Sequence, residues 1–253
     1  MTLRIAIIGV FSFLIALIGD PASIGLAQDS LEWPHVYRQG PGDGRYVAIT
    51  FDDAPTPDTG ELLAVLDSLD VRATFFVEGE FASWRPSLLQ DIVNAGHEIG
   101  NHTYNHPNVT KVNDETLADE LDSTNELIQT LTGVIPHLFR PPGGHYDSRV
   151  SDAAYASEMV TVLWSVNTSD YKGISSSEIC SRVVTNVRPG AIILLHDGVD
   201  NTRRALPSIV NRLRERGYTI VTVGEMIEMT GGPCPWVEHD ETWDGDAEMN
   251  VYF

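Results

Sequence analysis

Apolar runs typical of β-strands alternate with helical patterns along most of this chain, and this alternation restricts the possible folds more than any other feature. The apolar runs lie at 46–51, 73–77, 98–100, 136–139, 160–165, 191–195 and 218–221. The helical patterns follow them one by one, at 60–69, 86–95, 113–131, 148–157, 175–187, 202–216 and 223–229. Repeated strand–helix units predict a mostly parallel sheet that is covered by helices.

The central runs are apolar at almost every position, as in the sequence Ala-Ile-Ile-Leu-Leu at 191–195. Strands of this kind are buried on both faces of a sheet. The 253 residues of the chain suit one barrel of about seven such units, and an open doubly wound sheet is the alternative. In the longest helical pattern, Asn113 is the expected N-cap and Gly133 the expected end of the helix.

The two ends of the chain differ from the part that carries the strand–helix units. Residues 1–27 are expected to be a secretory signal peptide, in which Arg4 precedes an apolar run and cleavage follows Ala27. An uncleaved anchor is the alternative, and both interpretations imply export. Residues 28–44 are expected to form an extended segment, residues 45–230 the folded domain, and residues 231–253 an irregular acidic tail. We therefore expect a secreted or extracytoplasmic protein with no stable membrane insertion after cleavage.

The formal net charge of −20 arises from 36 acidic and 16 basic residues. Such a surface repels nucleic acid and anionic lipid, so neither is an expected partner. Export would also bring Cys180 and Cys234 into a compartment where disulfides persist. A bridge between them remains open at this point, because sequence does not give their distance.

Chemically reactive side chains follow the apolar runs at their carboxyl ends. In chain order they are Asp52 and Asp53, His102 and His106, Arg140, Asp170, and His196 with Asp197. Each of them alone has an ordinary interpretation as a turn residue, a helix cap or half of an ion pair. The carboxyl ends of parallel strands share one face, however, and active sites occupy that face. The shared location therefore predicts a single site.

The residue types in this set also fit one chemistry. Two histidines four residues apart would lie on one side of a helical turn and could bind one metal ion. One carboxylate would complete three ligands, and three ligands leave a position for water. A second carboxylate beside a cation could act as general base, and a further histidine as general acid. The sequence has no Gly-x-Ser-x-Gly elbow, no Gly-x-Gly-x-x-Gly pattern and no phosphate loop.

Five segments of the chain, taken in order, resemble the motifs of the NodB-like polysaccharide deacetylases, carbohydrate esterase family 4. These segments are Thr50-Phe51-Asp52-Asp53, His102-Thr103-Tyr104-Asn105-His106, Arg140-Pro141-Pro142-Gly143-Gly144, Trp164 through Asp170, and Leu194-Leu195-His196-Asp197. The resemblance implies that 45–230 is a NodB homology domain, an irregular (β/α) barrel of about seven units. It also implies a hydrolase that removes N-acetyl groups from N-acetylglucosamine polymers such as chitin, its oligosaccharides or peptidoglycan. An O-acetyl esterase acting on xylan-type polysaccharide and a non-catalytic carbohydrate-binding member of the fold are the alternatives.

The resemblance further implies a metal and a general base. Asp53, His102 and His106 would bind a divalent ion, usually Zn²⁺, for which Co²⁺ or another divalent ion could substitute. Asp52 would be the general base, and Arg140 would orient it.

The remaining implied roles concern the leaving group and the substrate. His196 would be the general acid, with Asp170 as its partner. The backbone N–H of Gly143 would help to hold the oxyanion, and Trp164 and Leu194 would line the substrate site.

Four positions depart from the family pattern. Ala54 stands where glycine is usual, Gly143 where tyrosine is common, Asn167 where aspartate is usual, and Tyr171 where tryptophan is usual. None of the four is an implied metal ligand or the implied base. We expect the partner to be an acetylated polysaccharide or oligosaccharide and the protein to be a monomer.

Overall fold

The computed structural model describes residues 36–229, and the sheet at its centre has nine strands. The strands are β1 (Val36–Tyr37), β2 (Tyr46–Ala54), β3 (Thr74–Val77), β4 (Glu98–Asn101), β5 (Leu138–Phe139), β6 (Val160–Val162), β7 (Val166–Asn167), β8 (Ala191–His196) and β9 (Thr219–Val221). All pairings between these strands are parallel, as predicted. The predicted signal peptide, the tail 231–253 and Cys234 lie outside the described residues, so the Cys180–Cys234 disulfide stays a prediction.

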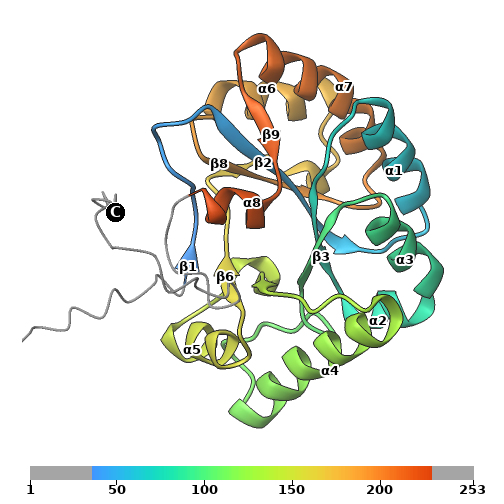
Figure 1. Cartoon of the computed structure of the whole chain (residues 1–253), viewed down its shortest axis with the longest axis vertical. Helices are drawn as coiled ribbons and strands as arrows, with labels where there is room; N and C mark the ends of the chain where they lie inside the picture. Colours follow the sequence, from blue (N-terminus) through green and yellow to red (C-terminus); the bar gives the residue numbers. More distant parts are fainter. Residues whose placement is uncertain (1–35, 230–253) are drawn as a thin grey trace, which may run out of the picture. The chain divides into compact units, whose positions relative to one another are not determined.

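The sheet curls into an irregular half-barrel, which was the predicted class, and it is not an open doubly wound sheet (Figure 1). Its strand order is β1-β6-β5-β4-β3-β2-β8-β7, and β9 pairs with the first residues of β2. Strands β6 and β7 lie near opposite ends of this order, yet only residues 163–165 separate them in the chain. The strand predicted at 160–165 is therefore shorter than expected, and a separate short strand that was not predicted, β7, follows it: β6 pairs with β1 and β5, and β7 pairs with β8.

Helices pack around this sheet, and the last of them, at 223–228, packs against the inner apolar cluster. They are α1 (Thr59–Ser68), α2 (Gly79–Trp84), α3 (Pro86–Asn94), α4 (Asp114–Thr132), α5 (Ser148–Ala156), α6 (Ser176–Asn186), α7 (Asp200–Glu215) and α8 (Val223–Glu228). The helix α4 begins and ends where predicted, because the Asn113 side chain accepts the N–H of Thr116 and Gly133 has φ 77°. The sequence did not predict α2 or β1. Within residues 36–229, no helix has the length and apolar character that crossing a bilayer requires.

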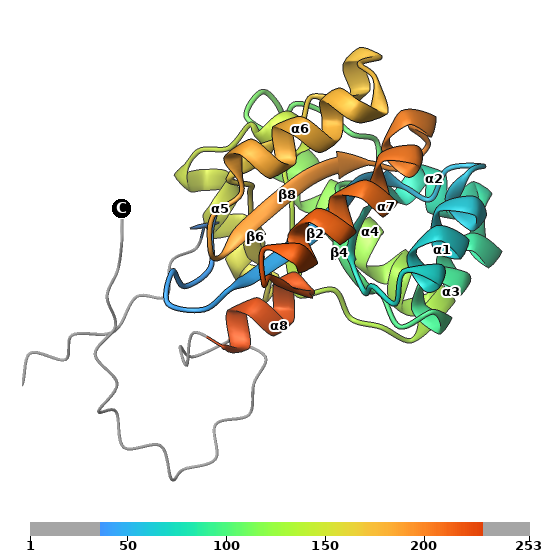
Figure 2. The ribbon, with the colours of Figure 1, turned by 90° about the horizontal axis from the view of Figure 1, so that it is seen from above.

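The side chains of β2 alternate between two apolar layers. Val47, Ile49 and Phe51 pack in the layer between the sheet and the outer helices, which includes α6 and α7 above β8 and β2 (Figure 2). Ala48 packs instead with Ile192 in the smaller inner cluster. The same period of two directs the next residues of β2, Thr50 and Asp52, to the inner side at the carboxyl end of the strand.

Candidate active site

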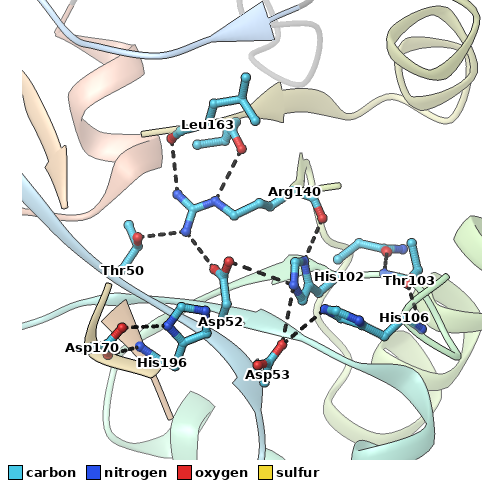
Figure 3. A network of polar contacts seen from close by, with 12 residues as sticks. Thr50, Asp52, Asp53, His102, Thr103, His106, Arg140, Leu163, Asp170 and His196 are labelled. Carbon is cyan, nitrogen blue, oxygen red and sulfur yellow. Dashed lines mark hydrogen bonds and ion pairs between the residues drawn. The ribbon is translucent and has the colours of Figure 1, made fainter. Parts of the chain in front are cut away.

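Seven of the eight polar residues predicted from strand ends meet at one end of the barrel, as Figure 3 shows, whereas the eighth, Asp197, accepts hydrogen bonds from Thr56, Thr59 and Gly198. They come from the ends of separate elements: Asp52 and Asp53 from β2, His102 and His106 from the loop after β4, Arg140 from the residue after β5, Asp170 from the turn after β7, and His196 from the end of β8. Parallel strands bring these ends together, which is the reason that strand-end residues could be grouped from the sequence.

Two adjacent carboxylates reach the same histidine because β2 is irregular where they lie. In a regular strand, neighbouring side chains point to opposite faces. Between Phe51 and Ala54 the register with β3 shifts, and Asp53 has a φ of 64°, a left-handed conformation that aspartate tolerates better than most residues. As a result, His102 Nε2 lies 3.8 Å from Asp52 Oδ2 and 3.5 Å from Asp53 Oδ1.

The two histidines are brought together by a loop, so the helical turn predicted from their spacing was wrong. Residues 102–109 contain no helix, and both Thr103 (φ 67°) and His106 (φ 54°) are left-handed. These two residues bend the backbone so that the imidazole centroids of His102 and His106 are 5.1 Å apart. His106 Nε2 lies 3.5 Å from Asp53 Oδ1, the same oxygen that faces His102.

Glu120 of α4 holds this loop in position, a role that the sequence analysis missed. Its Oε2 accepts the backbone N–H groups of Tyr104 (2.7 Å) and Asn105 (2.8 Å), and its Oε1 accepts the Asn105 side-chain amide (2.8 Å). A glutamate in an amphipathic helix is usually solvated, but Glu120 is only 6% exposed. The sequence did indicate that Glu120 is buried, because it lies beside Leu121 on the apolar face of α4.

We expect Glu120→Gln to weaken divalent-metal binding by about 10- to 100-fold, the usual cost of losing an outer partner of a metal site. The glutamine side chain has one acceptor oxygen for the loop N–H groups where glutamate has two. Competition with a chromogenic chelator measures the affinity, and Glu126→Gln, an exposed position of the same helix, is the matched control. Equal affinities in the two variants would contradict this assignment.

The acceptors around Asp53 are arranged as a cation would require. His102 Nδ1 lies 2.6 Å from the backbone carbonyl of Arg140, so the ring proton of neutral His102 belongs on Nδ1 and Nε2 carries a lone pair. Asp53 Oδ1, which faces that Nε2, is buried and has no hydrogen-bond partner among the described residues. The ligand atoms of Asp53, His102 and His106 all lie within 4.8 Å of one another. This set suits a divalent ion such as zinc.

The local charges also favour a cation. Burial raises the pKa of Asp53, but the adjacent imidazole of His102, with the charges of His196 and His106, outweighs it and lowers that pKa to about 2. Burial lowers the pKa of His102, but the Asp52 and Asp53 carboxylates outweigh it and raise that pKa above its ordinary value. Both shifts follow from the opposite charges of the carboxylates and His102, whereas burial and the charge of His102 lower the pKa of His106.

Arg140 is completely buried beside Asp52. Its Nη1 donates to Asp52 Oδ1 (2.7 Å) and to the Thr50 hydroxyl (2.7 Å), while Nε and Nη2 donate to the carbonyls of Val162 and Leu163 (both 3.2 Å). Burial lowers the pKa of Arg140, and Asp52 opposes that shift. The guanidinium therefore orients the Asp52 carboxylate and provides its counter-charge.

A second carboxylate–histidine pair lies on the other side of Asp52. Asp170 Oδ1 accepts from His196 Nδ1 (2.8 Å), and Asp170 Oδ2 accepts the backbone N–H of His196 (2.8 Å) and the Thr202 hydroxyl (2.6 Å). Burial lowers the pKa of His196, but Asp170, followed by Asp52 and Asp53, outweighs it and raises the pKa. Strand pairing sets His196 opposite Asp52. The site thus combines a carboxylate and a histidine that favours protonation.

The predicted substrate-facing residues lie around this centre. Gly143 and Gly144 are both left-handed, with φ of 63° and 70°, and Gly143 is exposed. A Cβ on Gly144 would lie 2.7 Å from Trp164, so this loop packs closely against the tryptophan. Trp164 is half-buried 5.7 Å from the Arg140 guanidinium, and Leu194 is buried on β8.

Two of the departures from the family pattern have clear structural places. Asn167 is exposed, and its Oδ1 accepts the backbone N–H of Ser169 (2.8 Å), so it stabilises the turn that leads to Asp170. Tyr171 packs its ring edge-on to His196, with centroids 5.2 Å apart. Neither substitution removes a contact between Asp170 and His196.

Glu78 was not predicted as a site residue, although it directly follows β3 and so carries the same strand-end signal. It is 6% exposed. Burial and the charge of Asp53 raise the pKa of Glu78 to about 7. It therefore adds a carboxyl group to the site end of the barrel that is partly protonated at neutral pH.

Comparisons with known proteins agree with this geometry. Residues 39–162 match the family model described as polysaccharide deacetylase. The chain is 37% identical to a peptidoglycan-N-acetylglucosamine deacetylase of Bacillus cereus, covering 75% of this chain and 70% of that protein. It is also 37% identical to the uncharacterized protein YlxY of Bacillus subtilis, over 67% of this chain but only about half (53%) of that protein.

Solved structures give the same result. The Bc1960 peptidoglycan N-acetylglucosamine deacetylase superposes with a TM-score of 0.75 at 36% identity, covering 78% of this chain and 94% of that one. BA3943 of Bacillus anthracis, described as a pseudoenzyme of carbohydrate esterase family 4, also gives 0.75, at 31% identity over 77% of this chain and 69% of that one. From the shared fold, the family-model match and these identities, the chain belongs to the polysaccharide deacetylase family.

Proposed function

We propose that this protein is a divalent-metal-dependent hydrolase that removes N-acetyl groups from an N-acetylglucosamine-containing polysaccharide outside the cytoplasm. The observation that carries the proposal is the buried, unpartnered Asp53 Oδ1, which faces the Nε2 atoms of His102 and His106 at 3.5 Å beside the Asp52–Arg140 pair. A three-ligand site with an adjacent carboxylate is the composition of a hydrolytic metal centre.

Asp53, His102 and His106 would hold the ion, for which zinc is the best fit to two imidazoles and one carboxylate. When bound, such an ion polarises the acetyl carbonyl and lowers the pKa of water. The loop contacts of Glu120 and the carbonyl of Arg140 keep the two imidazoles oriented.

Asp52 would accept a proton from the attacking water. Its Oδ1 is fixed by Arg140 at 2.7 Å, and its Oδ2 is directed toward His102, so the carboxylate cannot rotate freely. A base that is held in one orientation loses little entropy in the transition state. The exposed backbone of Gly143 would contribute an N–H to the developing oxyanion, next to the wall formed by Trp164.

His196 would donate a proton to the nitrogen of the departing amine. Asp170 accepts from Nδ1, so the second ring nitrogen is the one available for transfer to substrate. The products of this sequence are acetate and the free amine of the sugar, with one water consumed. An amide needs this protonation more than an ester does, which favours the N-acetyl group as the substrate.

The relatives favour an aminosugar polymer and a site of action at the cell wall, because several of them are named as peptidoglycan N-acetylglucosamine deacetylases, whereas one is named as a bifunctional xylanase/deacetylase. The pseudoenzyme BA3943 has the same fold, so the fold alone does not establish catalysis. In this chain every residue type required by the chemistry is present, and this favours catalysis over glycan binding alone.

We expect the metal-loaded protein to release acetate from oligomers of N-acetylglucosamine or from peptidoglycan faster than from acetylated xylan. The measurement is enzymatic detection of acetate across this panel, with mass spectrometry to find the 42-Da loss that accompanies each deacetylation. Release from xylan alone would make the protein an O-acetyl esterase. Absence of release from every member, with the metal bound, would indicate a non-catalytic protein.

A further inference from the structure

Four exposed arginines gather where α6 and α7 end, and none of them takes part in the chemistry described above. They follow α6, lie in the last turn of α7, follow α7 and precede β2, in the order Arg188, Arg212, Arg216 and Arg45. The helices α6 and α7 pack side by side above β8 (Figure 2). We refer to these four arginines as the arginine patch.

Contacts between neighbouring elements bring the arginine patch together. Arg45 Nη1 donates to the carbonyl of Arg216 (3.0 Å), and Arg216 Nη1 donates in turn to a carbonyl of α6. Arg188 donates to two carbonyls at the end of the same helix. Burial raises the pKa of Cys180 in α6, and the charge of Arg212 opposes that shift, so Arg212 lies near α6 as well. The four side chains therefore form one positive surface.

The arginine patch lacks the counter-charges that other arginines of this chain have. Elsewhere in residues 36–229, ion pairs with carboxylates are formed by Arg72, Arg140, Arg149, Arg182, Arg203 and Arg204. Within the same residues, no patch arginine forms an ion pair, not even with its chain neighbours Asp43 and Glu215. This is unexpected in a chain with 36 acidic and 16 basic residues.

A structural role at the helix ends explains the positions of these arginines but leaves their charge without a partner. The last carbonyls of a helix have no intrahelical donors and carry partial negative charge, so nearby arginines are favourable. The carbonyl contacts use only the Nη1 nitrogen of Arg45, Arg188 and Arg216. A guanidinium has five N–H donors, so most of them remain available to an anion.

The segment that follows α8 has the complementary charge. Residues 230–253 contain six acidic residues, all between 238 and 248, and no lysine or arginine. We refer to residues 238–248 as the acidic segment. A charged partner for the arginine patch is therefore present in the same chain.

The described part of the chain ends close to the arginine patch. Gly40 packs directly against Met226 of α8, and its N–H donates to the carbonyl of Gly190 (2.8 Å), two residues after Arg188. Helix α8 thus lies beside the loop that carries one patch arginine. An extended chain spans about 3.3 Å per residue, so residues 230–238 can cover about 30 Å. The acidic segment is therefore within reach of the patch.

We propose that the acidic segment docks on the arginine patch. This inference goes beyond the proposed catalytic function and does not depend on it. One exposed ion pair contributes little, but a segment of the same chain binds at a high effective concentration, so several weak pairs are sufficient. The predicted disulfide between Cys180 and Cys234 is compatible with this position, because Cys180 lies near Arg212.

We expect the double variant Arg212→Glu/Arg216→Glu to be cleaved about five- to ten-fold faster in the acidic segment by a glutamate-specific protease. This is the scale of two exposed ion pairs replaced by like-charge contacts. Mass spectrometry of the reduced full-length protein, at low salt, measures the release of the C-terminal fragments. The matched control is Lys111→Glu/Lys172→Glu, which changes the net charge equally at exposed positions outside the patch.

Charge exchange separates docking from an effect on stability. Asp240→Arg/Asp244→Arg should by itself speed cleavage, and combined with Arg212→Glu/Arg216→Glu it should restore protection, because the new charges are again opposite. Raising the salt to ~1 M should also speed cleavage of the unaltered chain, since the Debye length falls to ~3 Å. The variants in the acidic segment alter no residue of the described fold, so they test the docking even if the patch variant unfolds.

Two results would overturn the docking. The first is equal cleavage of the patch variant and the lysine control, or no restoration by the exchanged charges. The second is binding of added polyglutamate to the patch while the acidic segment is cleaved equally in all variants, which would assign the patch to an external anionic partner.

Discussion

Removal of the divalent ion should abolish deacetylation, and added Zn²⁺ or Co²⁺ should restore it. Three potential ligand atoms, on Asp53, His102 and His106, lie within 4.8 Å of one another, and the buried Asp53 Oδ1 among them has no hydrogen-bond partner in residues 36–229. Arg140 cannot replace the ion, because its guanidinium is fully engaged with Asp52, Thr50 and backbone carbonyls. Dialysis against a chelator, followed by titration with each ion, measures the loss and the recovery.

The same site predicts a large effect for His102→Ala. This variant should lose both metal and turnover, by more than the ~10- to 100-fold that loss of an outer partner costs. Elemental analysis of the purified variant gives the metal content, and acetate release gives the rate. His137→Ala is a suitable control, because His137 lies just before β5 at the opposite end of the barrel. Full activity in protein shown to be free of metal would exclude the proposed mechanism.

The strand–helix alternation was sufficient to predict most of the fold, because burial of a parallel strand on both faces leaves a direct trace in its composition. The caps of α4 were also predictable, since Asn113 and Gly133 act on their own local backbone. The break between β6 and β7 could not be predicted. The apolar run at 160–165 is a strand only as far as residue 162, and β7 begins beyond the run at residue 166, because β6 pairs with β5 and β7 pairs with β8.

The site was predictable to the level of which residues meet, but the local backbone was not. The helical turn assumed for His102 and His106 is replaced by left-handed residues at Thr103 and His106. The spacing of four residues does not distinguish a helical turn from this loop, because both place the two imidazoles on the same side of the backbone. The β2 irregularity at Asp53 and the support of the loop by Glu120 depend on contacts from β3 and α4, which lie outside the motifs.

The proton donor gives the second large prediction, in which His196→Ala loses at least ~10²-fold on an N-acetyl sugar and clearly less on an activated acetate ester. An amine is a poor leaving group until it is protonated, whereas an activated alkoxide leaves readily without an acid. The ring of His196 is fixed through Nδ1 by Asp170, and its raised pKa keeps it protonated. Both rates should be measured on one metal-loaded preparation, with equal metal content verified. Equal losses on the two substrates would mean that His196 organises the site without donating a proton.

The pH profile tests the same assignment through Asp170. An acid works only while protonated, so the amide rate should fall as pH rises through the pKa of His196. Burial lowers this pKa, but the hydrogen bond and charge of Asp170 raise it. The basic limb of the pH profile should therefore lie above the ordinary histidine pKa of ~6.5. Asp170→Asn removes the negative charge but keeps an oxygen to accept from Nδ1, so the limb should move to lower pH while the fold, monitored by thermal unfolding, is retained. If the basic limb stays in place in this variant, a group other than His196 titrates and His196 is not the proton donor. Glu78, whose pKa is raised to about 7, is then the first candidate.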